Sequence, residues 1–213
     1  MRYLTPLILS LLLTMAAFAS DGAGKQVVVL AYGDSLTAGY GLGPSDGFTP
    51  QLQAWLAERL THPVKVVNAG VSGDTSSGAR ARLEWTVAGL PNGKADLVIL
   101  ELGGNDVLRG IDPKITLTNM SAMINFFQSK GMQVLIAGMR SPPSYGPEYQ
   151  GAFDALYPDL ARQHQAKLYP FFLEGVAMDK NLNQADGIHP TKEGIAIIVE
   201  KIGPLVESML KQK

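Results

Sequence analysis

The chain has 213 residues, 46% of them hydrophobic and 17% charged, a balance that is typical of a globular protein with a sizeable core. Its net charge is -1 and its lysines and arginines are scattered, so it lacks the basic stripe of a nucleic-acid-binding protein. It contains no cysteine and only three histidines without metalloprotease spacing, which excludes disulfides and a cysteine nucleophile and argues against a metal site.

The first residues have the features of an export signal. Arg2 supplies a positive charge, residues 7–18 are almost wholly apolar, and Ala17-Phe18-Ala19 has the small-x-small pattern that a signal peptidase accepts. A transmembrane anchor is the alternative, but the apolar run is shorter than the ~20 residues that span a bilayer. We therefore expect residues 1–19 to be a cleaved signal peptide, and the mature protein to be periplasmic or secreted with no stable membrane anchor.

Short β-rich runs then alternate with longer helical stretches. In chain order, we expect a strand at 27–32, a helix at 49–60, a strand at 64–67, a helix at 76–88, a strand at 97–102, a helix at 113–130, a strand at 133–137, a helix at 148–165, a strand at 167–169 and a helix at 191–210. Apolar residues at helical spacing support the first helix. Gly131 follows the third, because glycine readily adopts the left-handed conformation that ends a helix.

Strands that are apolar throughout and alternate with helices predict a five-stranded parallel sheet in a three-layer α/β/α sandwich. No linker, repeat or low-complexity tract interrupts the pattern, so we expect residues 26–213 to form a single domain. In such sheets ligands bind at the carboxyl ends of the strands, near the point where the strand order switches. Residues with useful chemistry should therefore follow the strands.

Polar segments occur at these positions. In chain order they are Gly33-Asp34-Ser35-Leu36, Gly70-Val71-Ser72-Gly73-Asp74, Gly103-Gly104-Asn105-Asp106 and Asp186-Gly187-Ile188-His189-Pro190. The first three follow predicted strands, and the fourth precedes the last helix. We expect all four, although far apart in sequence, to meet at one edge of the sheet.

The residues in these segments suit nucleophilic catalysis. A serine hydroxyl needs a neighbouring base, and that base needs an orienting acid. Asp186 and His189 lie three residues apart, so the carboxylate can hold one imidazole nitrogen while the other faces Ser35. The backbone N–H of Gly73, the side-chain amide of Asn105 and the N–H of Ser35 suit an oxyanion in the transition state.

The four segments resemble those of the GDSL, or SGNH, hydrolase superfamily, whose second name stands for serine, glycine, asparagine and histidine. The likeness extends from Val27 to the C-terminal helix. Within the superfamily, the bacterial arylesterase, acyl-CoA thioesterase I and lysophospholipase L1 group is similar to the stretches AYGDSLTAGYGL, NAGVSGDTSSGARARL, ELGGNDVLRG and DGIHPTKEG. The resemblance implies the flavodoxin-like SGNH hydrolase fold.

The resemblance also implies roles for individual residues. Ser35, Asp186 and His189 would form the catalytic triad, and Ser35, Gly73 and Asn105 the oxyanion hole. No metal or organic cofactor is expected. The substrates would be small acyl esters, aryl esters, thioesters and lysophospholipids with short to medium acyl chains. We expect a periplasmic monomer or small homo-oligomer without a nucleic-acid partner.

Several nearby polar residues have structural interpretations. We expect Asp34 and Asp106 to hydrogen-bond loop backbone beside the catalytic residues rather than act on substrate. Asp74 is predicted to cap the helix that starts near Thr75. Glu101, at the end of an apolar strand, is expected to anchor loop backbone. His164 lies in a polar helical stretch and is expected to be a solvated surface residue.

The acyl pocket is predicted to lie between residues 107–111 and residues 140–149. The apolar residues expected to form its walls are Val107, Leu108, Ile111, Pro142, Pro143 and Tyr145. This lining favours acyl chains over sugars. Two alternatives stay open: a carbohydrate acetylesterase on the same catalytic core, and an acyl-binding protein that uses the pocket without chemistry.

Overall fold

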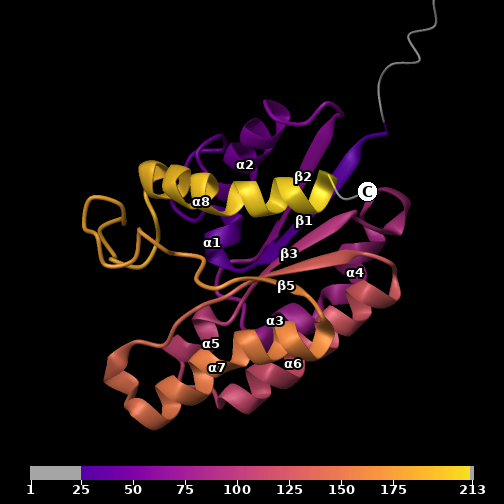
Figure 1. Cartoon of the computed structure of the whole chain (residues 1–213). Helices are drawn as coiled ribbons and strands as arrows, with labels where there is room; N and C mark the ends of the chain where they lie inside the picture. Colours follow the sequence, from indigo (N-terminus) through magenta and orange to yellow (C-terminus); the bar gives the residue numbers. More distant parts are fainter. Residues whose placement is uncertain (1–24, 212–213) are drawn as a thin grey trace, which may run out of the picture.

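The computed structural model describes residues 25–211, so the predicted signal peptide lies outside the described residues. Its centre is one sheet of five parallel strands in the order β2-β1-β3-β4-β5 (Figure 1). The strands are β1 (Val27–Gly33), β2 (Val64–Gly70), β3 (Leu97–Glu101), β4 (Gln133–Ala137) and β5 (Lys167–Tyr169). This confirms the predicted five-stranded parallel sheet.

Helices connect the strands. The longer ones are α2 (Phe48–Ala57), α6 (Pro113–Ser129), α7 (Pro147–His164) and α8 (Lys192–Lys211). The shorter ones are α1 (Ser35–Ala38), α3 (Ser76–Ala81), α4 (Leu83–Ala88), α5 (Gly104–Leu108) and the 3₁₀ turns Pro91–Gly93 and Pro143–Tyr145. The predicted positions of the longer helices agree with these bounds to within a few residues, whereas α1 and α5 were not predicted.

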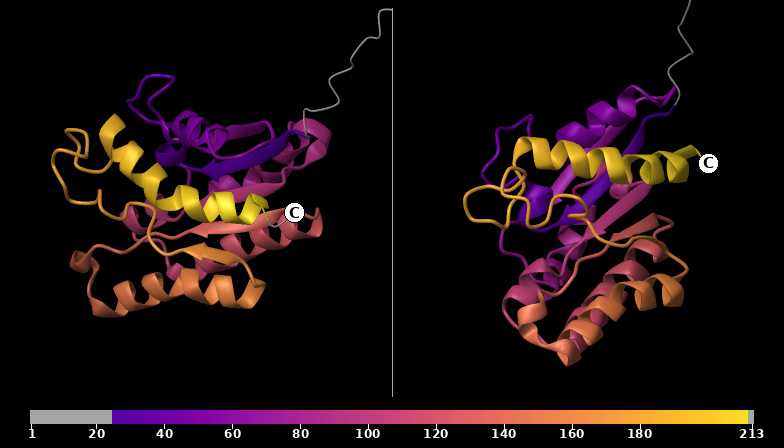
Figure 2. Two further views of the ribbon diagram at one scale, coloured as in Figure 1. Left: turned by 45° about the horizontal axis from the view of Figure 1, so that its top comes forward. Right: turned by 60° about the vertical axis from the view of Figure 1, so that its left-hand side comes forward.

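The helices form two layers, one on each face of the sheet. Helices α2 and α8 pack against each other on one face, and α3, α6 and α7 pack side by side on the other (Figures 1 and 2). The predicted α/β/α sandwich is therefore confirmed. Because β1, β3 and β4 are covered on both faces, nearly all their residues are buried, whereas the edge strands β2 and β5 have one buried residue each.

The core strands explain why this sequence folds as it does. Side chains such as Leu30, Leu97 and Ile99 are fully buried, and each large aliphatic side chain contributes about 1.5–3 kcal/mol of stability when it leaves water.

Both ends of helix α6 are set by local residues. The Asp112 side chain accepts a hydrogen bond from the N–H of Lys114 at its start, and Gly131 has a φ of 74° just after its end, as predicted.

Two local predictions were wrong. The helix expected at 76–88 is broken into α3 and α4 at Arg82, whose φ and ψ are -96° and 3°. The helix cap is Thr75, whose side chain accepts from the N–H of Gly78, and not Asp74. Asp74 instead pairs with the Arg82 Nε at 2.6 Å. Nη2 of Arg82 also donates to the carbonyl of Gly33 at 3.0 Å, so the arginine at the break ties α4 to the end of β1.

The strand order places the polar segments at one edge. Strand β1 lies between β2 and β3, so the connections after β1 and β3 leave the sheet next to each other at its carboxyl edge. The long loop between β5 and α8 lies on this same side of the molecule (Figure 1). Within residues 25–211, no helix is both long and apolar enough to cross a membrane.

Candidate active site

The nucleophile candidate lies at the junction of β1 and α1. Strand β1 ends at Gly33, and Asp34 caps the short helix α1 by accepting a hydrogen bond from the N–H of Leu36 at 3.0 Å. Ser35 is thereby the first residue of α1, directly beyond the carboxyl end of the sheet. A short helix and its cap therefore fix the direction of the Ser35 side chain.

The Asp186–His189 loop brings its imidazole to this hydroxyl. Nε2 of His189 lies 2.9 Å from Oγ of Ser35, although the two residues are 154 positions apart in the chain. Nδ1 of His189 lies 2.7 Å from Oδ2 of Asp186. The structure thus joins the three residues predicted as a triad in one hydrogen-bonded chain.

The loop also holds the Asp186 carboxylate in its charged form. Oδ1 of Asp186 accepts from the backbone N–H of His189 at 3.0 Å and from that of Ile188 at 2.9 Å. The backbone bond from His189, its ring bond and the bond from Ile188 lower the pKa of Asp186 to about 2. An ionised carboxylate can only accept, so Nδ1 carries a proton and Nε2 presents its lone pair to the Ser35 hydroxyl. This is the arrangement that a general base requires.

Tyr40 is a contact that the sequence did not predict. Its ring lies against the His189 imidazole, with centroids 4.5 Å apart and planes inclined by 37°. The backbone carbonyl of Tyr40 accepts from Nε2 of Gln184 at 2.8 Å, and the same amide group donates to the carbonyl of Pro190 at 3.0 Å. Tyr40 and Gln184 therefore fix the histidine loop against the end of the nucleophile segment.

The predicted oxyanion donors lie in the connections after β2 and β3. Gly73 has a φ of 82°, a conformation that glycine adopts easily, and its carbonyl accepts from Arg109 at 2.9 Å. Among residues 25–211, its N–H donates to no protein acceptor. Asn105, in the first turn of α5, donates from Nδ2 to Oδ2 of Asp34 at 3.0 Å. One amide hydrogen of Asn105 is held in place, and the other remains available for a ligand.

Two buried carboxyl groups lie beneath the nucleophile. Asp34 and Glu101 are almost inaccessible to solvent. Burial raises the pKa of Asp34 to about 6, against the lowering effect of the bonds from Leu36 and Asn105. Burial, and secondly the charge of Asp34, raise the pKa of Glu101 well above its ordinary range. Oε2 of Glu101 accepts from the Thr37 hydroxyl at 2.8 Å and from the backbone N–H of Asp34 at 3.4 Å, so Glu101 anchors this loop as expected.

The raised pKa of Asp34 predicts a pH dependence of stability. Between its ordinary value of 3.8 and about 6, the folded state retains a proton that the unfolded state has lost. The free energy of unfolding should therefore fall as pH rises through this window. The Asp34→Asn variant, which cannot titrate there, should show a shallower fall. Denaturant unfolding at several pH values between 4 and 7 measures both slopes, and identical slopes would contradict the assignment.

Asp106 has a structural position, as predicted, although its partners are mostly side chains. It is fully buried and accepts from the backbone N–H of Ser76 at 2.8 Å, from the Ser76 hydroxyl at 2.5 Å and from the Thr116 hydroxyl at 2.9 Å. It joins α3 and α6 to the segment that carries Asn105. The interpretation of His164 was wrong: it is half-buried, and its Nε2 lies 2.8 Å from the Ser121 hydroxyl.

A largely apolar cavity of about 490 Å³ opens at the Ser35–His189 pair. The predicted walls Val107, Leu108, Pro142 and Pro143 line it, whereas Ile111 and Tyr145 do not. Further apolar residues line the cavity that the sequence analysis did not single out: Leu36, Met139, Phe171, Leu173, Ala177, Met178 and Ile188. Most come from the loop between β5 and α8, which also carries Asp186 and His189, but residues 171–178 of that loop show no regular apolar pattern that would have indicated a cavity wall.

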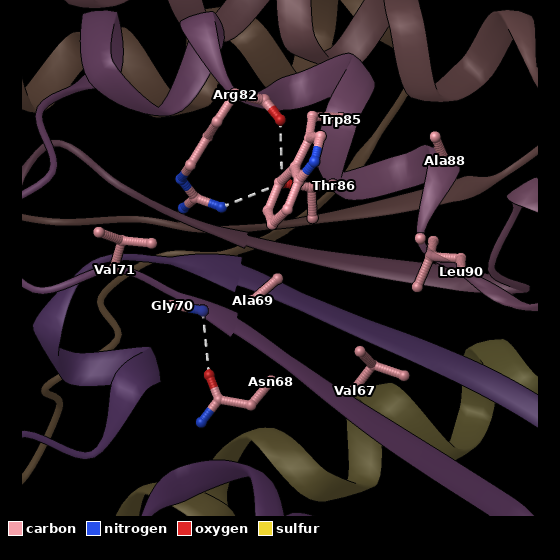
Figure 3. Close-up of a pocket in the computed structure, with 11 residues that line it drawn as sticks. Val67, Asn68, Ala69, Gly70, Val71, Arg82, Trp85, Thr86, Ala88 and Leu90 are labelled. Atoms are coloured by element: carbon pink, nitrogen blue, oxygen red, sulfur yellow. Dashed lines mark hydrogen bonds between the residues drawn. The ribbon is translucent and has the colours of Figure 1, made fainter.

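A second hollow of about 590 Å³ lies between β2 and α4 (Figure 3), and none of the catalytic side chains lines it. Its polar side chains are already paired. Asn68 accepts from the N–H of Gly70, and Arg82 donates to the Thr86 hydroxyl (Figure 3). This hollow contains no base or nucleophile, so the chemistry belongs to the Ser35 cavity. No group of three or more His, Asp or Glu side chains among residues 25–211 could hold a metal ion.

Comparison with known proteins agrees with this geometry. A sequence profile of the GDSL-like Lipase/Acylhydrolase family matches residues 31–197. Esterase TesA of Pseudomonas aeruginosa is 40% identical over 204 residues, which cover 96% of this chain and 98% of that protein. Thioesterase 1/protease 1/lysophospholipase L1 of Escherichia coli (strain K12) is 35% identical over 209 residues, covering 96% of this chain and 94% of that protein.

A solved structure gives the same result for the fold. The crystal structure of AlinE4, described as an SGNH-hydrolase family esterase, matches with a TM-score of 0.74 and 41% identity, covering 88% of this chain and 98% of that chain. The likeness in sequence and in structure covers the sheet and all four polar segments. The chain therefore belongs to the GDSL-like lipase/acylhydrolase family of serine hydrolases.

Proposed function

We propose that this enzyme hydrolyses carboxylic esters and thioesters of short to medium acyl chains through an acyl-enzyme on Ser35. The observation that carries the proposal is the hydrogen-bonded chain from Asp186 through His189 to Ser35, with separations of 2.7 and 2.9 Å, at the mouth of an apolar cavity. The names of relatives, an esterase and a thioesterase/lysophospholipase, support the same reaction class.

The reaction follows from the roles of these groups. Nε2 of His189 accepts the Ser35 proton as Oγ attacks the acyl carbon, and Asp186 stabilises the imidazolium that forms. The N–H groups of Ser35 and Gly73 and the Asn105 amide stabilise the oxyanion. His189 then donates its proton to the departing alkoxide or thiolate. A water molecule, deprotonated by His189, attacks the acyl-enzyme and releases the carboxylic acid and free Ser35.

The cavity favours an acyl chain as the group that binds beside Ser35. Most of the surface of its walls is apolar, contributed by side chains such as Met139, Phe171 and Leu173, and apolar walls bind hydrocarbon by excluding water. The N–H donors and the base act on any acyl carbonyl, so they do not distinguish an oxygen leaving group from a sulfur one. A carbohydrate acetylesterase with the same catalytic core is the second candidate.

A substrate panel on the purified enzyme tests the proposal. We expect faster turnover of p-nitrophenyl butyrate, p-nitrophenyl hexanoate and an acyl-CoA thioester than of acetylated xylan, because only the acyl chains fill the apolar cavity. Lysophosphatidylcholine should also be hydrolysed. Faster turnover of acetylated xylan than of the p-nitrophenyl esters would favour the carbohydrate acetylesterase instead.

We also propose that the enzyme is exported to the periplasm or secreted, and acts there after removal of residues 1–19. Support comes from the sequence: the positive Arg2, the apolar residues 7–18 and the Ala17-Phe18-Ala19 site. The absence of cysteine is compatible with an enzyme whose fold needs no disulfide.

A further inference from the structure

Exposed apolar side chains gather at the mouth of the catalytic cavity. Large hydrophobic side chains are mostly buried in this protein, but Met178 is 93% exposed, Leu108 49% and Ile188 46%, and all three line the cavity. We call these three residues the apolar rim. Leu108 ends α5, whereas Met178 and Ile188 belong to the loop between β5 and α8. Two separate segments thus present hydrocarbon to solvent around one opening.

Met178 combines an unfavourable backbone conformation with an exposed apolar side chain. Its φ of 69° lies in the left-handed region, which glycine, asparagine and aspartate adopt more readily than other residues. The strained backbone carries an apolar side chain that is almost fully exposed. Neither feature stabilises the enzyme in water, and backbone strain of this kind is concentrated at functional sites. Exposed apolar patches beside a cavity mark surfaces that contact a partner.

Cations flank the apolar rim. Arg109 follows Leu108, and Arg140 lines the cavity with its guanidinium 5.0 Å from the Phe171 ring centroid. Neither arginine forms an ion pair with a carboxylate among residues 25–211. Nη2 of Arg109 donates to the carbonyl of Gly73 at 2.9 Å, and its other N–H groups are the ones left for a phosphate. Of the acids in the loop between β5 and α8, Asp186 is paired with His189, and Oδ1 of Asp179 accepts from the backbone N–H of Asn181 at 2.9 Å. A guanidinium without a carboxylate partner is well suited to a phosphate group.

We propose that the apolar rim docks on a phospholipid surface with anionic headgroups, with Arg109 and Arg140 facing the phosphates. This rests on the proposed function, since the cavity behind the apolar rim is the one that would receive the acyl chain. A chain leaving such a surface would pass between Leu108, Met178 and Ile188 into the cavity without crossing water. The combination of hydrocarbon, phosphate-binding cations and an acyl cavity fits a lipid surface.

Site-specific fluorescence tests the orientation, because the chain contains no cysteine. Single cysteines introduced as Met178→Cys and Ile188→Cys, and as Trp85→Cys for a control, are labelled with an environment-sensitive fluorophore in the full chain. Trp85 is a matched control, since it is 81% exposed but lies at the hollow beside β2 (Figure 3). Each protein also carries Ser35→Ala, so that lipid is not consumed. The probe is a vesicle of phosphatidylcholine and phosphatidylglycerol.

The expected result is a blue shift of the labels at positions 178 and 188 on vesicles, with none at position 85. Without labels, Met178→Asp together with Ile188→Asp should weaken vesicle binding by about tenfold or more, and Trp85→Ser should not. Both rim side chains are substantially exposed, so the variant should fold. Vesicles of phosphatidylcholine alone should bind less well, because the choline cation neutralises each phosphate and the surface has no net negative charge to attract the arginines.

Unshifted labels at positions 178 and 188, or an equal shift at position 85, would overturn the proposal. Whatever part of residues 1–24 the protein retains is the same in every variant, so lipid binding through that segment alone would leave all three labels unshifted. Turnover of soluble p-nitrophenyl butyrate by the enzyme with Ser35 intact is measured separately. A protein that hydrolyses this ester but fails the vesicle test is an esterase without the docking surface.

Discussion

Ser35→Ala should abolish ester hydrolysis while leaving the fold intact. Loss of a catalytic serine reduces kcat by about 10⁶-fold in serine hydrolases, because the residual rate depends only on binding and the oxyanion donors. The variant loses one hydroxyl that lies 2.9 Å from Nε2 of His189, which should cost about 1 kcal/mol of stability or less. Turnover of p-nitrophenyl butyrate and the melting temperature of the variant measure both effects.

The same variant distinguishes an enzyme from an acyl-binding protein. A fluorophosphonate probe reacts only with an activated serine, so it should label the wild type and not Ser35→Ala. Absence of labelling in the wild type would indicate that the cavity binds acyl groups without chemistry. Activity of Ser35→Ala close to that of the wild type would show that the nucleophile has been assigned wrongly.

Asn105→Ala should reduce kcat by about 10²–10³-fold with a much smaller change in KM. The loss of one oxyanion donor costs about 2.7–4 kcal/mol of transition-state stabilisation in other serine hydrolases. In this structure the Asn105 amide is oriented by its bond to Oδ2 of Asp34 at 3.0 Å. The donor is therefore held in place before substrate binds, and its loss should affect mainly the transition state. Steady-state kinetics on a p-nitrophenyl ester measure the effect.

Asn119→Ala is the matched control for this prediction. Asn119 is a buried asparagine whose amide donates to the hydroxyls of Ser76 and Ser77, and it makes no hydrogen bond to Ser35, Asn105 or His189. Its loss should lower the melting temperature and leave the kcat of the folded enzyme nearly unchanged. Equal losses of kcat in the two variants would indicate that Asn105 acts through structure and not as an oxyanion donor.

The central strands and the polar segments were predictable for physical reasons. Strands β1, β3 and β4 are covered on both faces, so they appear in the sequence as continuous apolar runs. The strand-order rule for parallel sheets then places the segments after β1 and β3, which carry Ser35 and Asn105, next to each other at the carboxyl edge. Local pattern and one topological rule suffice for this part.

Some features of the structure cannot be predicted from the local sequence pattern, because they depend on tertiary contacts or are too short. The break between α3 and α4 coincides with the tertiary contacts of Arg82 to Asp74 and to the carbonyl of Gly33. Helices α1 and α5 are only four and five residues long, too short to show helical periodicity. The tilted ring contact between Tyr40 and His189 joins residues almost 150 positions apart, and nothing in the sequence around either residue indicates it.

The loop that carries Asp186 and His189 forms one of the two triad contacts by itself, without help from the rest of the fold. Acid and base lie three residues apart, and the Asp186 carboxylate accepts from the backbone N–H groups of Ile188 and His189, so their relative geometry is local to one tight turn. Only the separation between His189 and Ser35 depends on the whole fold. The active site is thus assembled from two preformed pieces, and the Gln184 amide, bound to the carbonyls of Tyr40 and Pro190, sits at their junction. Of the two contacts in the triad, only the one between His189 and Ser35 therefore depends on how distant parts of the chain pack together.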